Sequence, residues 1–385
     1  MTIVMLGHKG VPAKSGGIER HVEELSAGLA RLGARVISFD RAWYVGNEPS
    51  PKGVERRFSH GLRTKHLDAI THTFTALFLA KRERPDVLHI HGVGPSLLLP
   101  LARVLHPRAR IISTFHCVDH LHAKWGFVAR TMLRIGEYFS CAFADRTIAV
   151  SDFLASYCLN EYQAQTAVIP NGVRIPNTTA PVAPLDQFSL APKRYFLMAT
   201  RLVGHKNVHV AIEAHHLLWL RRPELAAAYP LVIAGGSSWT APYARDLRAT
   251  AAMYPHVRLV GERTGTELHA LQNHAACHLS VSDSEGMSIS LLEAMALGRP
   301  VIVSDIPANA EVTGRLAPRV PAGDPHTLSD AMECAALLSD AERDAAGLML
   351  QNCVRANHDW DRIAEATLRV YEEALGASVT SQAIA

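Results

Sequence analysis

The sequence predicts an α/β protein with two Rossmann-like, doubly wound domains that face each other across a central cleft. The chain has 385 residues, which is long for a single hydrophobic core. Short β-branched runs alternate with amphipathic stretches, a pattern typical of parallel sheets with helices on both faces. The alternation lapses once, at a proline-rich segment near the middle of the chain. These three observations favour two domains of the same architecture.

Six runs in the first half are expected to be strands: TIVML, RVISF, DVLHI, RIISTF, RTIAV and TAVI. Residues 18–33, IERHVEELSAGLARLG, place five apolar side chains on one face of a predicted helix, and Gly33 can end it: Ile18, Val22, Leu25, Leu29 and Leu32. We therefore assign residues 1–176 to an N-terminal domain.

The segment PNTTAPVAPLDQFSLAPK, residues 176–193, contains four prolines, and we expect a linker over residues 177–193. The theme then repeats with YFLMAT, LVIAG, VRLV, CHLSVS and PVIVS in a C-terminal domain over residues 194–357. The last helix, WDRIAEATLRVYEEAL, lies within residues 358–376, and residues 377–385 are expected to be a frayed tail.

Composition indicates a soluble enzyme, with 48% hydrophobic and 19% charged residues and no apolar run as long as a membrane span. The opening MTIVMLG is too short for a signal peptide, so we expect a cytoplasmic location. The six cysteines are scattered, which favours free thiols over disulfides. Residues 1–176 hold 22 Lys and Arg against 14 Asp and Glu, a surplus of +8. This surplus suggests an anionic partner or a membrane surface, although an unevenly solvated surface explains it equally well.

The segment RLVGHKN follows a predicted strand and places two cations, Arg201 and Lys206, before a helix that starts near Asn207. Ligands of such sheets bind beyond the carboxyl ends of the strands, and a helix N-terminus attracts anions. We therefore predict a site for a diphosphate. The alternative is a surface Arg and Lys beside a turn.

The stretch SDSEGMSISLLEAMALGRPVIVSD, residues 282–305, holds two glutamates around a strand-to-helix turn. Carboxylates accept hydrogen bonds from vicinal hydroxyls, so Glu285 and Glu293 suit a sugar ligand. The N–H groups between them can bind a phosphate at the start of the helix: Gly286, Met287, Ser288 and Ile289. An alternative for Glu293 is a capping box with Ser290, because the two have the S-x-x-E spacing.

Two further positions at strand ends are candidates. Gly16 and Gly17 precede the first helix, where they would let a ligand approach the backbone; a flexible turn is the alternative. His116 ends the strand RIISTF and is either a ligand-facing or a core histidine. His89 with His91, and His120 with His122, have zinc-like spacing. The sequence shows no third ligand for either pair, so we predict no metal site.

Together these residues resemble the retaining glycosyltransferases of family 4, which have the GT-B fold. The similar segments follow the family order over nearly the whole chain: SGGIERHV, TFH, VIPNGV, TRLVGHKN, LVIAGG and SEGMSISLLEAMALGRPVIVSD. The segment AKWG with the basic stretch after it is most similar to bacterial rhamnosyl- and hexosyltransferases of cell-surface polysaccharide synthesis. One departure is EGMS, where many members have E-G-F-G, so that Ser288 replaces a glycine.

The resemblance implies an acceptor-side N-terminal domain, a C-terminal domain that binds a nucleotide sugar, and a last helix that crosses back to the first domain. It implies that Arg201 and Lys206 hold the diphosphate. Glu285 and His116 would contact the donor sugar, and Glu293 the ribose. Gly16 and Gly17 would lie where acceptor and phosphate meet.

The implied reaction moves a hexosyl or deoxyhexosyl group from a nucleotide-diphosphate sugar to a glycan or lipid-linked acceptor, with retention of configuration. The donor is a co-substrate, and no cofactor, metal or nucleic acid takes part. Two other functions stay open: a sugar-nucleotide 2-epimerase of the same architecture, and a non-catalytic subunit that binds a sugar nucleotide.

Two basic segments suggest peripheral contact with the inner face of the cell membrane. Residues 120–134, HLHAKWGFVARTMLR, mix Lys and Arg with apolar side chains, and residues 52–66 are also basic. Such segments suit anionic lipid. The alternative is an ordinary helix that packs on the sheet and keeps a solvated basic face.

Overall fold

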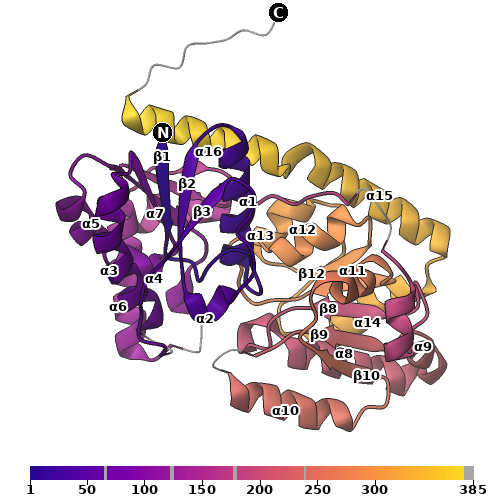
Figure 1. The fold of residues 1–385 in the computed structure, drawn as a ribbon. Coiled ribbons are helices and arrows are strands. Elements are labelled where there is room, and N and C mark those ends of the chain that lie inside the picture. Colours follow the sequence, from indigo (N-terminus) through magenta and orange to yellow (C-terminus); the bar gives the residue numbers. More distant parts are fainter. Residues whose placement is uncertain (65–66, 122–124, 177–179, 238–239, 377–385) are drawn as a thin grey trace, which may run out of the picture. The chain divides into compact units, whose positions relative to one another are not determined.

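The computed structural model describes residues 1–64, 67–121, 125–176, 180–237 and 240–376 (Figure 1). The chain divides into two compact units, each of which is described below by itself. Unit 1 contains Met1–Gly172 and Trp360–Ala385, and unit 2 contains Val173–Asp359.

Unit 1 is built on a parallel sheet of order β3-β2-β1-β4-β5-β6-β7. Its strands are β1 (Thr2–Leu6), β2 (Arg35–Asp40), β3 (Val54–Phe58), β4 (Val87–His91), β5 (Arg110–Phe115), β6 (Arg146–Ala149) and β7 (Ala167–Val168). All six predicted runs form strands, and β3 is the strand that the sequence analysis missed. It is an edge strand, VERRF, whose arginines pair with Asp40 and Glu83.

Helices cover both faces of this sheet. They are α1 (Gly17–Arg31), α2 (Ala42–Val45), α3 (Asp68–Ala80), α4 (Val93–Ser96), α5 (Leu99–Leu105), α6 (Phe127–Ala142), α7 (Asp152–Tyr162) and α16 (Trp360–Leu375). Alternate residues of β1 serve two separate cores. Ile3 and Met5 pack with α1 and α16, whereas Val4 and Leu6 pack with α3 and α5. This alternation is the period of two that a doubly covered strand requires.

The last helix belongs to unit 1 although it comes at the end of the chain. Trp360, Ile363 and Tyr371 are buried in the same core as Val22 and Leu25 of α1. Two glycines allow this close packing. A Cβ atom at Gly28 would lie 2.6 Å from that of Ala364, and one at Gly172 would lie 2.6 Å from the Trp360 ring.

Unit 2 has a parallel sheet of order β10-β9-β8-β11-β12-β13. Its strands are β8 (Phe196–Ala199), β9 (Leu231–Ala234), β10 (Val257–Gly261), β11 (Cys277–Ser280), β12 (Val301–Ser304) and β13 (Arg319–Val320). Its helices are α8 (Val208–Arg221), α9 (Pro223–Ala228), α10 (Ala241–Ala252), α11 (Gly265–Asn273), α12 (Ile289–Ala296), α13 (Pro307–Thr313), α14 (Pro325–Leu337) and α15 (Asp340–Asn357). The five predicted runs correspond to β8–β12.

The segment predicted as a linker is mostly part of unit 2. Residues 177–179 lie outside the described residues, but Ala180, Leu185 and Leu190 are buried against Tyr195 and Leu197. The boundary therefore falls after Gly172 and not after residue 176. The prolines interrupt helices and strands, but the segment still packs on the core, because burial of its apolar side chains is favourable.

Candidate functional site

Two loops of unit 2 meet at the carboxyl ends of β8 and β11. The first runs from Arg201 to Asn207, and the second from Val281 to Ser288. The Asp283 N–H donates to the carbonyl of His205 at 2.8 Å, and the Asn207 side-chain amide donates to the carbonyl of Val281 at 3.1 Å. These bonds join the segments TRLVGHKN and SDSEGMS, which lie about 80 residues apart.

The ion pair between Lys206 and Glu285 lies where the loops meet. The Lys206 ammonium donates a hydrogen bond to Glu285 Oε1, and each side chain is 12% exposed. Burial alone would raise the pKa of Glu285. The charge of Lys206 and hydrogen bonds from Lys206 and Ser282 outweigh burial and hold that pKa below its ordinary value. Glu285 is therefore a carboxylate at neutral pH. Lys206 and Glu285, which were predicted from two separate segments, form one ion pair.

The other predicted residues of this region lie in the same two loops and at the start of α12. Arg201 is exposed two residues after β8. Residues Gly286 to Ile289 are buried and lead into α12, whose first N–H groups have no partner within the helix. A positive helix terminus thus lies directly after Glu285 in the chain.

The structure contradicts the capping box of Ser290 with Glu293. The N-cap of α12 is Ser288, whose hydroxyl accepts from the Leu291 N–H at 3.4 Å. The third helical position is therefore Leu291. Glu293 lies in the second turn, where its carboxylate accepts a hydrogen bond from Gln272 Nε2 at 3.1 Å. The serine that replaces the usual glycine at 288 is thus the residue that starts this helix.

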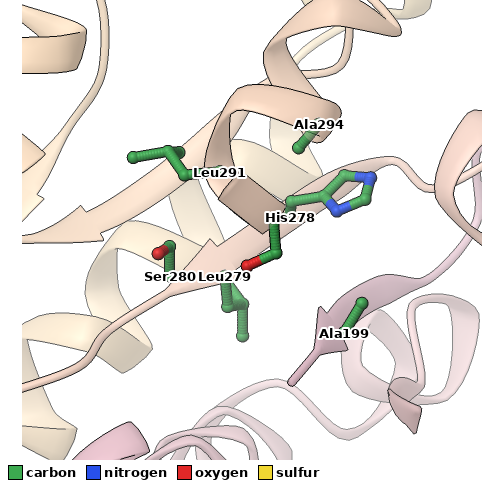
Figure 2. A pocket seen from close by; sticks show the side chains of 7 residues that line it. Ala199, His278, Leu279, Ser280, Leu291 and Ala294 are labelled. Atoms are coloured by element: carbon green, nitrogen blue, oxygen red, sulfur yellow. The ribbon is translucent and has the colours of Figure 1, made fainter. Parts of the chain in front are cut away.

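A small pocket lies beside the first turns of α12 (Figure 2). Its cavity volume is about 10 Å³, and it is lined by Ala199, His278, Leu279, Ser280, Ser290, Leu291 and Ala294. A cavity of this volume has room for about one water molecule. This pocket is therefore too small to hold a nucleotide sugar by itself, although it adjoins the ends of β8 and β11.

In unit 1, Gly16 and Gly17 lie at the start of α1, as predicted. Gly16 has a φ of 103°, a conformation that favours glycine. The carboxylate of Glu19 lies against it and accepts a hydrogen bond from the Lys9 N–H at 3.2 Å. Burial would raise the pKa of Glu19, but Lys9 and further hydrogen bonds lower it, so this helix start carries a buried negative charge. Glu19 was not predicted as a site residue from the sequence, although an acidic residue in a first helical turn is a known stabilising feature.

His116 follows β5 and is buried with two other histidines. Its Nε2 lies 3.2 Å from His91 Nδ1, and its ring lies 4.8 Å from that of His21, measured between centroids. His21 was not recognisable from the sequence as a third ligand beside the H-x-H motif, because it comes from α1, far away in the chain. His120 has another partner, Glu137, at 2.8 Å, and His122 lies outside the described residues.

Comparisons with known proteins bear on the function of both units. Residues 15–175 match the family model described as Glycosyltransferase Family 4, and residues 193–340 match Glycosyl transferases group 1. The chain is a glycosyltransferase of the GT-B fold. The predicted α/β class with two Rossmann-like domains is thereby confirmed, as is glycosyl transfer from a nucleotide-sugar donor.

Relatives resemble this glycosyltransferase over most of their length. It is 26% identical to a glycogen synthase of Mycobacterium tuberculosis, with 96% of this chain and 94% of that protein covered. It is 27% identical to a phosphatidyl-myo-inositol mannosyltransferase of Mycobacterium leprae, with 74% and 73% covered. A solved structure of sucrose-phosphate synthase from Thermosynechococcus elongatus has a TM-score of 0.81 at 20% identity, with 98% of this chain and 100% of that chain covered.

Two further findings concern the described residues of both units. No helix among the described residues is long and apolar enough to cross a membrane. All six cysteines of the glycosyltransferase are free thiols, as the scattered spacing predicted.

Proposed function

We propose that this glycosyltransferase moves a hexosyl or deoxyhexosyl group from a nucleotide-diphosphate sugar to a glycan or lipid-linked acceptor with retention of configuration. The observation that carries the proposal is the Lys206–Glu285 pair at the junction of two loops, beside the N-terminus of α12. This arrangement places a cation, a carboxylate and a helix terminus at the carboxyl edge of one sheet, where ligands of such sheets bind.

The three groups suit different parts of a donor. Lys206, Arg201 and the N–H groups from Gly286 to Ile289 favour a diphosphate through charge and hydrogen bonds. Glu285 offers a carboxylate to the sugar hydroxyls. Because Glu285 holds Lys206 in place before the donor arrives, the ammonium needs little reorganisation to meet the diphosphate.

The reaction breaks the bond between the anomeric carbon and the diphosphate oxygen, and negative charge grows on that oxygen. Lys206, Arg201 and the α12 terminus would stabilise this charge in the transition state, which is the role that metal ions take in other transferases. The acceptor hydroxyl would then attack from the face that the leaving group vacates and pass its proton to the departing diphosphate oxygen, so that the configuration is retained. On this basis we propose that no metal ion or other cofactor takes part.

Glu293 is proposed to accept hydrogen bonds from the ribose of the donor. We expect Glu293→Gln to weaken donor binding about tenfold, because a charged acceptor exceeds a neutral one by roughly 1.4 kcal/mol. Calorimetric titration with the donor measures this change. Glu224→Gln, at an exposed position of α9 in the same unit, is the matched control. An unchanged dissociation constant for Glu293→Gln would remove Glu293 from the donor site.

A lipid-linked acceptor at a membrane surface is favoured by the first half of α6. Phe127 is 84% exposed and Val128 is 70% exposed, next to Arg130 and Arg134 on the same helix. Exposed apolar side chains beside cations suit an anionic bilayer surface. One relative is named as a phosphatidyl-myo-inositol mannosyltransferase, which agrees with an acceptor of this kind. We therefore propose a peripheral location on the inner face of the cell membrane.

The second basic segment contributes less to this surface than its composition suggests. Arg56 and Arg57 lie in β3, where Asp40 and Glu83 neutralise them, and residues 65–66 lie outside the described residues. Lys124, in the first segment, also lies outside them.

We expect the double substitution Arg130→Glu and Arg134→Glu to weaken binding to anionic vesicles by at least about 30-fold. Each arginine near such a surface contributes about 1 kcal/mol, and two together give this factor. Flotation with phosphatidylserine-containing vesicles at low salt measures it. The matched control reverses two exposed arginines outside α6, Arg82→Glu with Arg108→Glu. If wild type does not float with these vesicles, the acceptor is a soluble one.

An acceptor-dependence assay tests the proposed function. The protein is incubated with UDP-, GDP-, ADP- and dTDP-sugars, with and without a lipid or glycan extract, and release of the nucleoside diphosphate is measured. Acceptor-dependent release that survives excess EDTA supports the proposal. An epimerised sugar without acceptor would indicate a 2-epimerase, and binding without any turnover would indicate a non-catalytic subunit. Loss of activity with EDTA and recovery with magnesium would contradict metal independence.

A further inference from the structure

Unit 1 buries a cluster of three histidines that come from three separate elements. His21 lies on α1, His91 ends β4 and His116 follows β5. They are at most 8% exposed. Each offers one ring nitrogen, and these three nitrogens lie within 4.8 Å of one another.

The hydrogen bonds leave two of these rings with an unused nitrogen. Asn171 Oδ1 accepts from His21 Nδ1 at 2.8 Å, which fixes the proton on Nδ1 and leaves a lone pair on Nε2. In the described part of the chain, His21 Nε2 has no hydrogen-bond partner. His91 Nε2 has none either, but it is the opposite nitrogen of that ring from Nδ1, which lies against His116. Buried polar atoms are almost always paired, so the unpaired nitrogen of His21 in this cluster indicates a missing ligand.

Two neighbouring histidines are not part of the cluster. His89 stands beside His91 in the H-x-H motif, but Tyr371 and Thr114 occupy its two nitrogens, each at 2.6 Å. His8, whose ring centroid lies 6.4 Å from that of His91, also has an unpaired Nδ1, but it does not belong to the group of three whose nitrogens converge. Burial holds the pKa of His21 at about 4 and those of His91 and His116 well below their ordinary value. The imidazoles are neutral, which is the form that binds metals.

The distances fit a tetrahedral ion. With zinc–nitrogen bonds of about 2.0–2.1 Å, two ligand nitrogens lie about 3.3 Å apart. The pair His91 Nδ1 and His116 Nε2 already has a separation of 3.2 Å. Since the third nitrogen lies within 4.8 Å of the others, it needs to move by no more than about 1.5 Å. Asn171 would act as the outer partner that orients His21, as the second groups around metal sites do.

We propose that His21, His91 and His116 form a binding site for a divalent transition metal of the zinc class. Three protein nitrogens leave one tetrahedral position for water or an anion. Imidazole ligands favour zinc over magnesium or calcium, which prefer oxygen. The site belongs to unit 1, whereas Lys206 belongs to unit 2.

One consequence rests on the proposed function. If His116 contacts the donor sugar, a bound zinc ion would occupy its ring and inhibit transfer. The enzyme would then need no metal for turnover and would be switched off by one.

Metal binding is measured directly, without any enzyme assay. Metal-free protein is titrated with Co²⁺, and the visible absorption of a tetrahedral cobalt centre is followed; displacement by Zn²⁺ gives the zinc affinity. We expect one ion per chain. His21→Gln and His91→Gln should each weaken binding by more than the roughly 10–100-fold that loss of an outer partner causes. His215→Gln, which alters a buried histidine of unit 2, is the matched control and should bind as wild type does.

A second measurement uses wild type alone, so it stays valid if a variant fails to fold. Addition of Zn²⁺ should shift the imidazole ¹⁵N resonances of the three clustered histidines. No tetrahedral cobalt spectrum, or shifts confined to exposed histidines, would overturn the proposal. Zinc binding without inhibition would uphold the metal site and instead contradict the role of His116 in donor binding, so the two failures are distinguishable.

Discussion

Deletion of residues 360–385 should yield an insoluble or inactive protein, whereas removal of residues 377–385 alone should leave activity unchanged. Helix α16 supplies part of the core of unit 1, with Trp360 and Tyr371 almost fully buried. Its loss would expose the apolar face of α1, which residues such as Val22 and Leu25 form. Soluble yield and far-ultraviolet circular dichroism of the two truncations measure the effect.

A single substitution tests the same packing without truncation. Trp360→Ala should lower the free energy of unfolding by about 3–5 kcal/mol, the usual cost of removing a buried aromatic side chain. Glu373→Ala, on the exposed side of the same helix, should change it by less than about 0.5 kcal/mol. Equal stability of Trp360→Ala and wild type, or a soluble active enzyme that lacks residues 360–385, would show that α16 is dispensable.

Lys206→Ala should lower turnover at saturating donor by about 10²–10³-fold, the usual effect of removing one group that stabilises charge in a transition state. The variant should also be less stable, because Glu285 keeps a largely buried charge without its partner. Breaking a buried ion pair costs up to about 3–5 kcal/mol. Steady-state kinetics and chemical denaturation measure the two effects separately.

A double variant separates catalysis from folding. Lys206→Met with Glu285→Gln removes both charges, so it should recover most of the stability that Lys206→Ala loses. Its turnover should stay low, because neither charge is present to act on the donor. Wild-type turnover in folded Lys206→Ala would exclude Lys206 from the reaction. Recovery of turnover in the double variant would assign the pair a purely structural role.

The sequence predicted the buried strands of unit 1 well, but it did not predict the edge strand β3. Strands such as β1 and β5 are buried on both faces and rich in apolar, β-branched residues, so their composition indicates a parallel sheet. Strand β3 is rich in charged residues. Its arginines form ion pairs with Asp40 and Glu83, which are distant from them in the sequence. The predicted linker was too long for a related reason. Prolines mark turns, but they do not show whether nearby apolar residues such as Leu185 are buried in a core.

The candidate site shows the same limit. The positions of Lys206 and Glu285 after two strands were predictable, because carboxyl ends of parallel strands share one edge. The ion pair between Lys206 and Glu285 was not predictable, because it depends on the geometry of the two loops. The S-x-x-E spacing suggested a capping box, but the helix starts two residues earlier, at Ser288. His21 could not be linked to His116 at all, because their contact comes from packing of α1 on the sheet.

The central claim is that unit 2 binds a nucleotide-diphosphate sugar through Lys206, and a thermal-shift screen tests it most directly. UDP-, GDP-, ADP- and dTDP-sugars are compared on wild type and on the double variant Lys206→Met, Glu285→Gln. At a concentration of 100 times the dissociation constant, the correct donor stabilises the native state by about 2.7 kcal/mol. For a unit of this size we expect a rise in Tm of about 5–10 °C in wild type, and much less in the double variant. The account is contradicted if none of the nucleotide sugars raises the Tm of wild type, or if the double variant responds equally.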